Sequence, residues 1–345
     1  MFIVLRFWLF VRYGCMISNC LRNRIPLLTS FIFKILSKMT KIAFQRVCVL
    51  WKKEKKHYVK VSTMAAYSLI IQNHLEPRFK TLDEITSRSV QTFVNSKLKD
   101  GLGATTVKGI LIVLKMLLNF GEKRGWVRHR IIDVKFPTQR MTPRTEVLSV
   151  SEEQRMLDYL STHRDHYNLG LQICLFTGMR IGEVCALRWE DVDVKSGTIR
   201  VRRTVHRVYV IDNGPKHSEL TIDYPKTAGS YRDIPVIRDL AVILSEYSRS
   251  AVGSHFVISG LSHPTEPQTM RNHFKKVAFD LGLSMRRFHG LRHTFATRCV
   301  ESKCDYKTLS SILGHSSVST TLNLYVHPGM EQKRKCVENM MRSIV

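Results

Sequence analysis

The chain has 345 residues, of which 44% are hydrophobic and 24% are charged. These fractions are typical of a globular protein and exclude a disordered or fibrous one, and the length suits two domains better than one. With 54 Lys and Arg against 28 Asp and Glu, the net charge is +26, which favours a nucleic acid as partner. The 8 cysteines show no metal-binding spacing, so we interpret them as reduced core residues of a cytoplasmic protein.

Residues 1–41 form an atypical N-terminal extension that is both basic and apolar. Arginines interrupt its apolar runs, which argues against a membrane span, and no small-residue cleavage site indicates a secretory signal. Three interpretations remain: a basic arm that contacts DNA, a helix on a membrane surface, or translated sequence upstream of a true start at Met39. We favour the last, because domain-like patterning begins only after Met39.

Residues 42–132 show apolar side chains at helical spacing and predict a bundle of four helices. Ser62 and Ser87 are the predicted N-caps of the second and third helices, and Gly125 is predicted to end the fourth. The exposed faces are rich in lysine. Lysines on exposed helix faces often do no more than contact solvent. Because lysines so strongly outnumber acidic residues on these faces, we favour a surface that binds DNA.

Residues 133–148 contain two prolines and little periodicity, which predicts an extended linker. The second domain, residues 149–345, has a mixed pattern. Ser151 and Gln154 have the spacing of a capping box at its first helix. We expect helices near residues 151–162, 167–187, 238–249, 267–281, 290–303 and 305–313, and strands of a small sheet in residues 198–211, 219–224 and 231–236.

The last stretch of the chain has an apolar helical stripe formed by Val337, Met340, Met341 and Ile344, with charges opposite. Such a stripe usually belongs to a core helix. At a chain terminus it could equally dock on a neighbouring subunit.

Arg180 and Glu183 lie three residues apart in the segment TGMRIGE. Phosphoryl transfer needs fixed positive charge for the non-bridging oxygens, which many proteins supply with a metal ion. A guanidinium can supply that charge because it grips two oxygens at once. The alternative for this pair is a purely structural ion pair, which the segment alone does not exclude.

The segment HGLRH contains His289 and His293 at the spacing of a zinc-binding helix. Position two is Gly290 instead of the glutamate of H-E-x-x-H, so the general base of a metalloprotease is missing. His289 and Arg292 are instead presented together, in a pattern suited to a phosphate. We assign His293 a structural role.

Five segments in order, TGMRIGE, PKT, HGLRHTFAT, LGHSSVSTT and Tyr325, resemble the tyrosine recombinase family, the integrases of phages and transposons. The resemblance covers residues 42–345. It implies a mainly α fold with a small antiparallel β-sheet, in which a four-helix core-binding domain and an α+β catalytic domain form a C-shaped clamp on DNA. The C-terminal helix would dock on another subunit.

The resemblance also implies roles for individual residues. Arg180 and Arg292 would clamp the scissile phosphate, and Tyr325 would attack it. The family's lysine matches Lys226 in YPKT better than Lys216 in GPKH, and it would act as general acid. The remaining members of the expected site are His289 and His315, which would bind the phosphate or assist proton transfer, and Glu183, which would support the site.

The function that follows is site-specific recombination of DNA through a 3′-phosphotyrosine, with no metal and no other cofactor, in the integration or excision of a mobile element. The expected partners are double-stranded DNA and accessory proteins that bend DNA or set direction. The protein is expected to form a homotetramer on paired sites and can be a monomer in solution; no membrane is expected. Two alternatives stay open: a nicking-closing enzyme like type IB topoisomerases, and a non-catalytic DNA-binding regulator with this fold.

Overall fold

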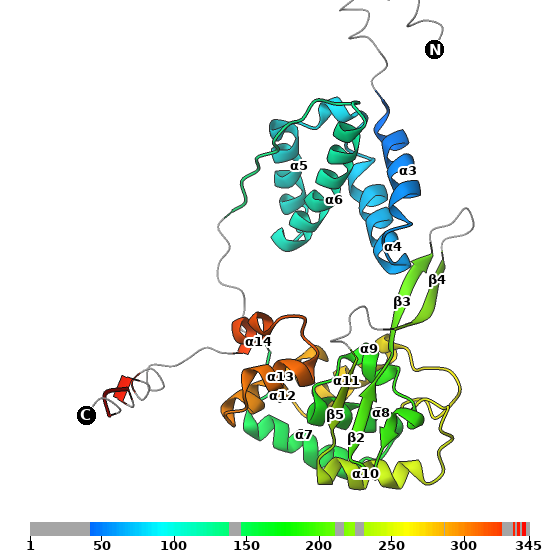
Figure 1. The fold of residues 1–345 in the computed structure, drawn as a ribbon, viewed down its shortest axis with the longest axis vertical. Helices are drawn as coiled ribbons and strands as arrows, with labels where there is room; N and C mark the ends of the chain where they lie inside the picture. The colour runs from blue at the N-terminus through cyan, green and yellow to red at the C-terminus, as the bar shows by residue number, and fades with distance from the viewer. Residues whose placement is uncertain are drawn as a thin grey trace, which may run out of the picture. The chain divides into compact units, whose positions relative to one another are not determined.

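The computed structural model describes residues 42–137, 146–210, 217–224, 231–285 and 287–325, together with residues 334, 337, 338 and 340–342. The chain divides into two compact units, residues 1–138 and 139–345 (Figure 1). Each unit has its own hydrophobic core. The extension of residues 1–41, Lys216 and Lys226 lie outside the described residues.

Residues 42–137 of the first unit form a bundle of four helices, as the apolar periodicity predicts. Their buried faces form one core, in which Trp51 and Phe93 are among the large side chains. A π-helical turn extends the second helix, and a short 3-10 turn precedes the third. The elements are α3 Phe44–Lys55, α4 Val61–Ile70, η2 Ile71–Leu75, η3 Leu82–Glu84, α5 Ser87–Lys99 and α6 Ala104–Lys123.

The predicted N-caps of this bundle are wrong by one or two residues. The α4 helix starts after Lys60, which makes no side-chain cap, so Ser62 lies inside the helix. The cap of α5 is Thr86, whose hydroxyl accepts a hydrogen bond from the Ser89 amide, while the Ser89 hydroxyl accepts one from the Thr86 amide. A serine thus takes the place that glutamate usually has in a capping box, which hides the signal in the sequence.

The α6 helix is, among the described helices, the one with the length and apolar composition of a membrane span. Half of that segment is buried inside the protein. Val107, Ile110, Leu114 and Leu117 are almost fully buried in the core of the bundle. Its apolar character is therefore explained by its place at the centre of the first unit.

In the second unit, helices pack around a hydrophobic core to which both helices and strands contribute (Figure 1). The helices fall close to the ranges that the sequence predicts, and a further helix, α14, carries Tyr325. The elements are α7 Val150–Thr162, α8 His166–Thr177, α9 Ile181–Cys185, η4 Trp189–Asp191, α10 Arg238–Ser248, α11 Pro267–Asp280, α12 His289–Glu301, α13 Tyr306–Leu313 and α14 Val318–Tyr325.

The strands are antiparallel as expected, but they form two sheets instead of one. The predicted long strand is interrupted at Arg202 and Arg203, whose side chains pair with Asp233 and with the acids of η4. One sheet has the order β1, β2, β5 with Ile199 opposite Ile234, and the other is a hairpin of β3 and β4. The strands are β1 Val192–Asp193, β2 Thr198–Val201, β3 Thr204–Val210, β4 His217–Asp223 and β5 Arg232–Pro235.

Two helix ends of the second unit also differ from the prediction. The first helix is capped by Ser149 and Glu152, not by Ser151 and Gln154; the hydroxyl of Ser149 accepts from the Glu152 amide and the Glu152 carboxylate accepts from the Ser149 amide. The predicted helix of residues 167–187 is broken at Gly178, which has a left-handed φ of 64°. Gly178 ends α8 in the left-handed conformation that is typical of helix C-termini. Arg180 therefore lies outside α8, directly before α9.

Gly178 should resist replacement. A Cβ at this position would lie 2.5 Å from Cδ1 of Phe295 and 2.8 Å from Cδ2 of Leu313, and the backbone is left-handed. We expect Gly178→Ala to lower the free energy of unfolding by about 1–3 kcal/mol. Thermal or urea unfolding measures this loss. Gly253→Ala is the control, because nothing lies within 4 Å of its added Cβ; equal stability of the two variants would contradict the argument.

Candidate active site

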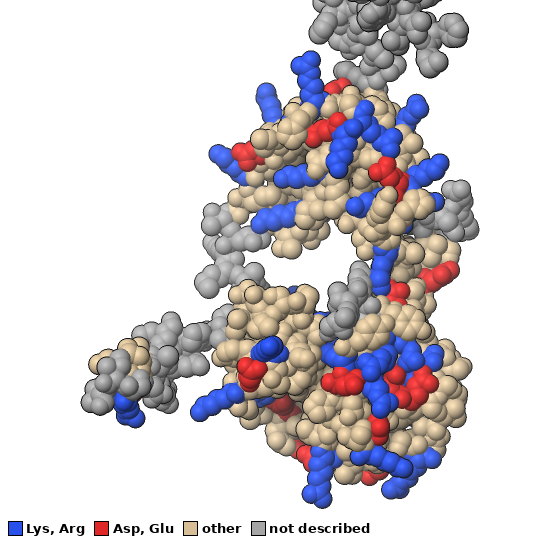
Figure 2. Space-filling view, in the orientation of Figure 1, with Lys and Arg blue, Asp and Glu red and all other residues tan. Residues whose placement is uncertain are grey.

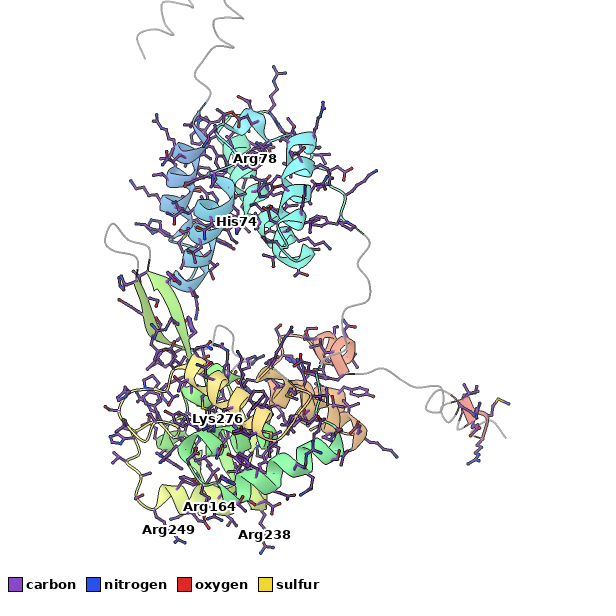
Figure 3. All side chains as sticks on the ribbon, turned by 180° about the vertical axis from the view of Figure 1, so that it is seen from behind. His74, Arg78, Arg164, Arg238, Arg249 and Lys276 are labelled. Atoms are coloured by element: carbon purple, nitrogen blue, oxygen red, sulfur yellow. The ribbon has the colours of Figure 1, made fainter. Side chains whose placement is uncertain are left out.

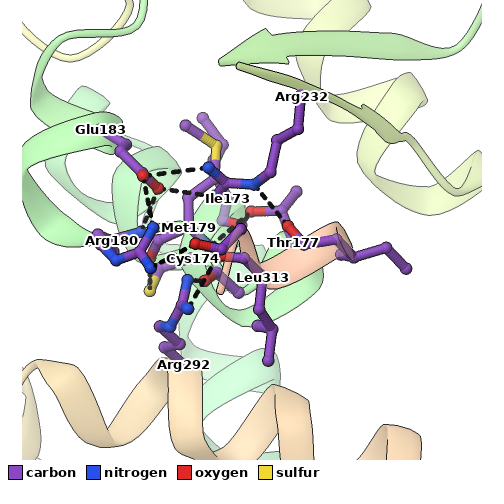
Figure 4. A network of polar contacts seen from close by, with 12 residues as sticks. Ile173, Cys174, Thr177, Met179, Arg180, Glu183, Arg232, Arg292 and Leu313 are labelled. Atoms are coloured by element: carbon purple, nitrogen blue, oxygen red, sulfur yellow. Dashed lines mark hydrogen bonds and ion pairs between the residues drawn. The ribbon is translucent and has the colours of Figure 1, made fainter. Parts of the chain in front are cut away.

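Three arginines converge on the C-terminal end of α13 (Figure 4). The last carbonyls of a helix have no partner within the helix, and the helix dipole places partial negative charge there, so cations bind well. The arginines come from distant parts of the chain: one precedes α9, one lies on β5 and one on α12. The contacts are Arg232 Nε to the Ile312 carbonyl at 2.5 Å, Arg292 Nη2 to the Leu313 carbonyl at 2.9 Å, and Arg180 Nη2 to the Gly314 carbonyl at 2.9 Å.

Glu183 connects two of these arginines. Its carboxylate accepts hydrogen bonds from Nη1 of Arg180 at 2.9 Å, and from Nη1 and Nη2 of Arg232 at 3.1 and 2.8 Å. Burial alone raises the pKa of this carboxyl, but the hydrogen bonds and charge of Arg232, with the charge of Arg180, outweigh it and lower the pKa to about 2. Glu183 is therefore ionised and fixes both guanidiniums.

Arg292 is the most deeply buried of these three arginines. It is 1% exposed, and its Nη1 also donates to the Gly178 carbonyl at 2.8 Å. Burial, with the charge of Arg180, lowers its pKa to about 10, so the guanidinium remains charged at neutral pH. The Arg180 side chain, by contrast, is 38% exposed. The site thus offers one accessible guanidinium and holds a second positive charge behind it.

Tyr325 is the last residue of α14 and is 8% exposed. It packs in a small core cluster with Ala296, Leu309 and Leu313. Its hydroxyl lies 2.8 Å from Nδ1 of His293. Burial raises the pKa of the phenol above its ordinary value, and the charge of Arg292, a hydrogen bond from Arg292 and the charge of Arg180 oppose the shift. The phenol is therefore protonated at neutral pH and lies next to two guanidinium charges.

The rings of His293 and His315 lie next to the phenol, and His289 lies next to His293. The His289 and His293 rings meet edge to face with centroids 4.6 Å apart, and the His315 ring lies parallel to the Tyr325 ring at 6.5 Å. Nδ1 of His315 is held by the hydroxyl of Thr321 at 2.9 Å. Desolvation lowers the pKa of all three rings, to about 4 for His293 and His315, with help from nearby arginines. They are neutral at physiological pH and can accept or relay a proton.

The structure brings together most of the residues that the sequence selects, namely Arg180, Glu183, His289, Arg292, His315 and Tyr325. Lys226 cannot be placed because it lies outside the described residues. Within the part of the chain that the structure describes, no group of three His, Cys, Asp or Glu side chains is arranged to hold a metal ion.

Two residues at the site go beyond what the sequence selects. The sequence predicts Arg232 only as part of a strand, although alternation puts it on the same buried face as Ile234. An arginine on the buried face of a strand needs a buried acid as partner, and that was the available signal. The structural role predicted for His293 stays a prediction; among the three histidines, the structure gives His293 the hydrogen bond with the Tyr325 hydroxyl.

Comparison with known proteins identifies the family. The model of the phage integrase family matches residues 146–332, more than half of the chain, and a model of the N-terminal SAM-like domain of phage integrases matches residues 43–98. The chain belongs to the phage integrase family. This integrase is therefore a tyrosine recombinase, an enzyme that cleaves and rejoins DNA in site-specific recombination.

Individual relatives agree with this assignment. A tyrosine recombinase XerC-like protein of Caldanaerobacter subterraneus subsp. tengcongensis is 27% identical over 278 residues, which are 74% of this chain and 71% of that protein. The Tn1549 transposon integrase, solved in complex with transposon right end DNA, has a TM-score of 0.71 at 21% identity and covers 86% of this chain and 99% of that one. A lambda integrase tetramer bound to a Holliday junction has a TM-score of 0.63 at 17% identity, covering 87% and 82%. These two structures show that the fold is shared.

Glu183 should stabilise this integrase in a pH-dependent way. Its pKa in the folded state, about 2, lies below the ordinary value of 4.5, so its contribution is complete above pH 4.5 and is lost as the pH falls towards 2. We expect Glu183→Gln to lower the free energy of unfolding at pH 7 by about 3–5 kcal/mol, because a buried guanidinium loses its partner. The measurement is thermal unfolding of both proteins between pH 7 and pH 3.

The difference between the two melting temperatures should shrink below pH 4.5. Glu246→Gln provides the control, because Glu246 pairs with Arg164 at the surface and such pairs contribute at most about 1 kcal/mol. A difference that stays constant down to pH 3 would show that the Glu183 charge is not what stabilises the site.

Proposed function

We propose that this integrase breaks and rejoins DNA through a covalent 3′-phosphotyrosine on Tyr325, in the integration or excision of a mobile element. The observation that carries the proposal is the place of the Tyr325 hydroxyl, which lies among neutral histidines and next to the charges of Arg292 and Arg180. A phenol with these neighbours is suited to attack a phosphodiester, because the cations stabilise the negative charge of the transition state.

The proposed reaction proceeds in one displacement and its reversal. The Tyr325 oxygen forms a bond to the scissile phosphorus, and the bond from phosphorus to the 5′-oxygen breaks. The phenol gives up its proton to one of the neutral imidazoles of the site, and the leaving 5′-oxygen takes a proton from a general acid, for which we propose Lys226. Because the energy of the phosphodiester bond is kept in the phosphotyrosine, a free 5′-hydroxyl of the same or another strand can reverse the step.

The cationic residues have different parts in this proposal. The exposed guanidinium of Arg180 binds the non-bridging oxygens directly, while Glu183 and the Gly314 carbonyl fix its orientation. Arg292 supplies charge from beneath, held by the carbonyls of Gly178 and Leu313. His289 and His315 bind the phosphate or relay protons, a role that their neutral state allows.

We further propose double-stranded DNA as the partner of both units. Lys and Arg side chains protrude over the surface of the helical unit (Figure 2), and the net charge of the chain is +26. The relatives with this fold that are solved on transposon DNA and as a tetramer on a Holliday junction support a homotetramer on paired sites. Accessory proteins that bend DNA would set the direction, and the reaction would take place in the cytoplasm.

Tyr325→Phe should abolish covalent attachment to DNA, because the ring remains but the attacking oxygen is lost. The measurement uses a suicide substrate, a core site nicked near the cleavage position so that the released fragment diffuses away. Denaturing electrophoresis then shows a protein band shifted by the bound strand. Tyr209→Phe is the control, since Tyr209 is half exposed on β3 and outside the site. Attachment that persists in Tyr325→Phe would refute the proposal.

Arg180→Ala should slow formation of the covalent complex by about a hundredfold or more, as expected when a donor to the transition-state oxygens is removed. DNA affinity, measured by gel shift at fixed salt, should change little. The matched control is Arg238→Ala. Arg238 is an exposed arginine, the first residue of α10, and points away from the unit (Figure 3). If affinity falls as much as the rate, Arg180 is a DNA-positioning contact and not part of the reaction.

A further inference from the structure

His293 has a place that its neighbours in the HGLRH segment do not have. Its Nδ1 lies 2.8 Å from the Tyr325 hydroxyl, and the two rings are in contact with centroids 5.6 Å apart. No hydrogen bond of comparable geometry joins this hydroxyl to His289 or His315 within the described residues. Arg292 also donates a hydrogen bond to this oxygen, but a guanidinium cannot accept the hydroxyl proton. Because Tyr325 is nearly buried, the acceptor of that proton determines where the hydroxyl points.

The direction of this hydrogen bond follows from the charges around it. Arg292, His289 and His315 face the His293 ring, and desolvation together with these groups lowers its pKa to about 4. The ring is therefore neutral at physiological pH. The phenol, whose pKa is raised, keeps its proton. The hydroxyl donates and Nδ1 accepts, which requires the tautomer of His293 with its proton on Nε2.

We propose that His293 is a positioning residue for the nucleophile, holding the Tyr325 hydroxyl toward the arginine group by accepting its hydrogen bond. The inference rests on the proposed function of Tyr325 but concerns a different residue. Without the acceptor, the proton of the buried hydroxyl loses its partner, because Arg292 can only donate to the phenol oxygen, and the phenol leaves its place to donate a hydrogen bond to water. A misdirected nucleophile lowers the rate without changing the affinity for DNA.

A matched pair of substitutions isolates the hydrogen bond. Asparagine and leucine have nearly the same shape, but only asparagine has an oxygen near the position of the histidine Nδ1 that can accept from Tyr325. His293→Asn therefore keeps the acceptor and His293→Leu removes it. The same change at an exposed residue of this unit, His263→Leu, controls for the loss of an imidazole.

The first measurement needs no DNA. Tetranitromethane modifies accessible tyrosines, and peptide mass spectrometry follows Tyr325 with the half-exposed Tyr209 as internal reference. We expect modification of Tyr325 to be about tenfold faster in His293→Leu than in the wild type, and nearly unchanged in His293→Asn and His263→Leu. Equal rates in the leucine and asparagine variants would overturn the proposal, because packing and not the acceptor would then hold the phenol.

The second measurement is single-turnover cleavage of the suicide substrate. His293→Leu should be about tenfold slower than wild type at saturating DNA with an unchanged dissociation constant, and His293→Asn should recover most of the rate. Loss of rate in both variants would also overturn the proposal, since the imidazole itself and not an acceptor would then be needed. If the wild type forms no covalent complex, the proposed function fails, while the nitration rates still decide the role of His293.

Discussion

The C-terminal end of α13 is the interaction on which the site depends. Its carbonyls at Ile312, Leu313 and Gly314 each receive a different arginine, so one helix end fixes three guanidiniums that are far apart in the sequence. Gly314 makes this end possible, because its φ of 65° turns the chain away and its missing side chain leaves room for Arg232. The same turn delivers His315 to the site. Geometry and charge are therefore set together by one helix terminus.

The charge of this group explains why its members differ in exposure. Three guanidiniums with one buried carboxylate carry excess positive charge, which is costly in a low dielectric unless each cation has acceptors. Glu183 serves Arg180 and Arg232, and helix-end carbonyls serve all three. The excess remains unneutralised and is directed at the surface through Arg180. An anion such as a phosphate would complete the balance, so the cost in the free protein favours binding of that ligand.

The sequence predicts the helices well, and most of the residues that its motifs select lie together in the structure, for a physical reason. Apolar periodicity reports burial, and short motifs such as TGMR and HGLR record local geometry that the chain itself imposes. What it predicts poorly depends on contacts between distant segments. Arg202 and Arg203 divide the predicted strand because they pair with Asp233, Asp191 and Glu190, and no local pattern contains that information. Arg232 is a similar case, since its partner Glu183 precedes it by 49 residues.

The proposed nucleophile is held differently from the arginines. Arg232 and Arg292 lie on β5 and α12, which contribute Ile234 and Leu291 to the main core, whereas Tyr325 belongs to a small separate cluster with Ala296, Leu309 and Leu313. A small cluster stabilises its members less, so α14 can move at a lower free-energy cost than the elements that carry the arginines. Packing alone then fixes the phenol loosely. The direction of its hydroxyl then depends on hydrogen bonds, and His293 is in place to accept the hydroxyl proton while Arg292 donates to the oxygen.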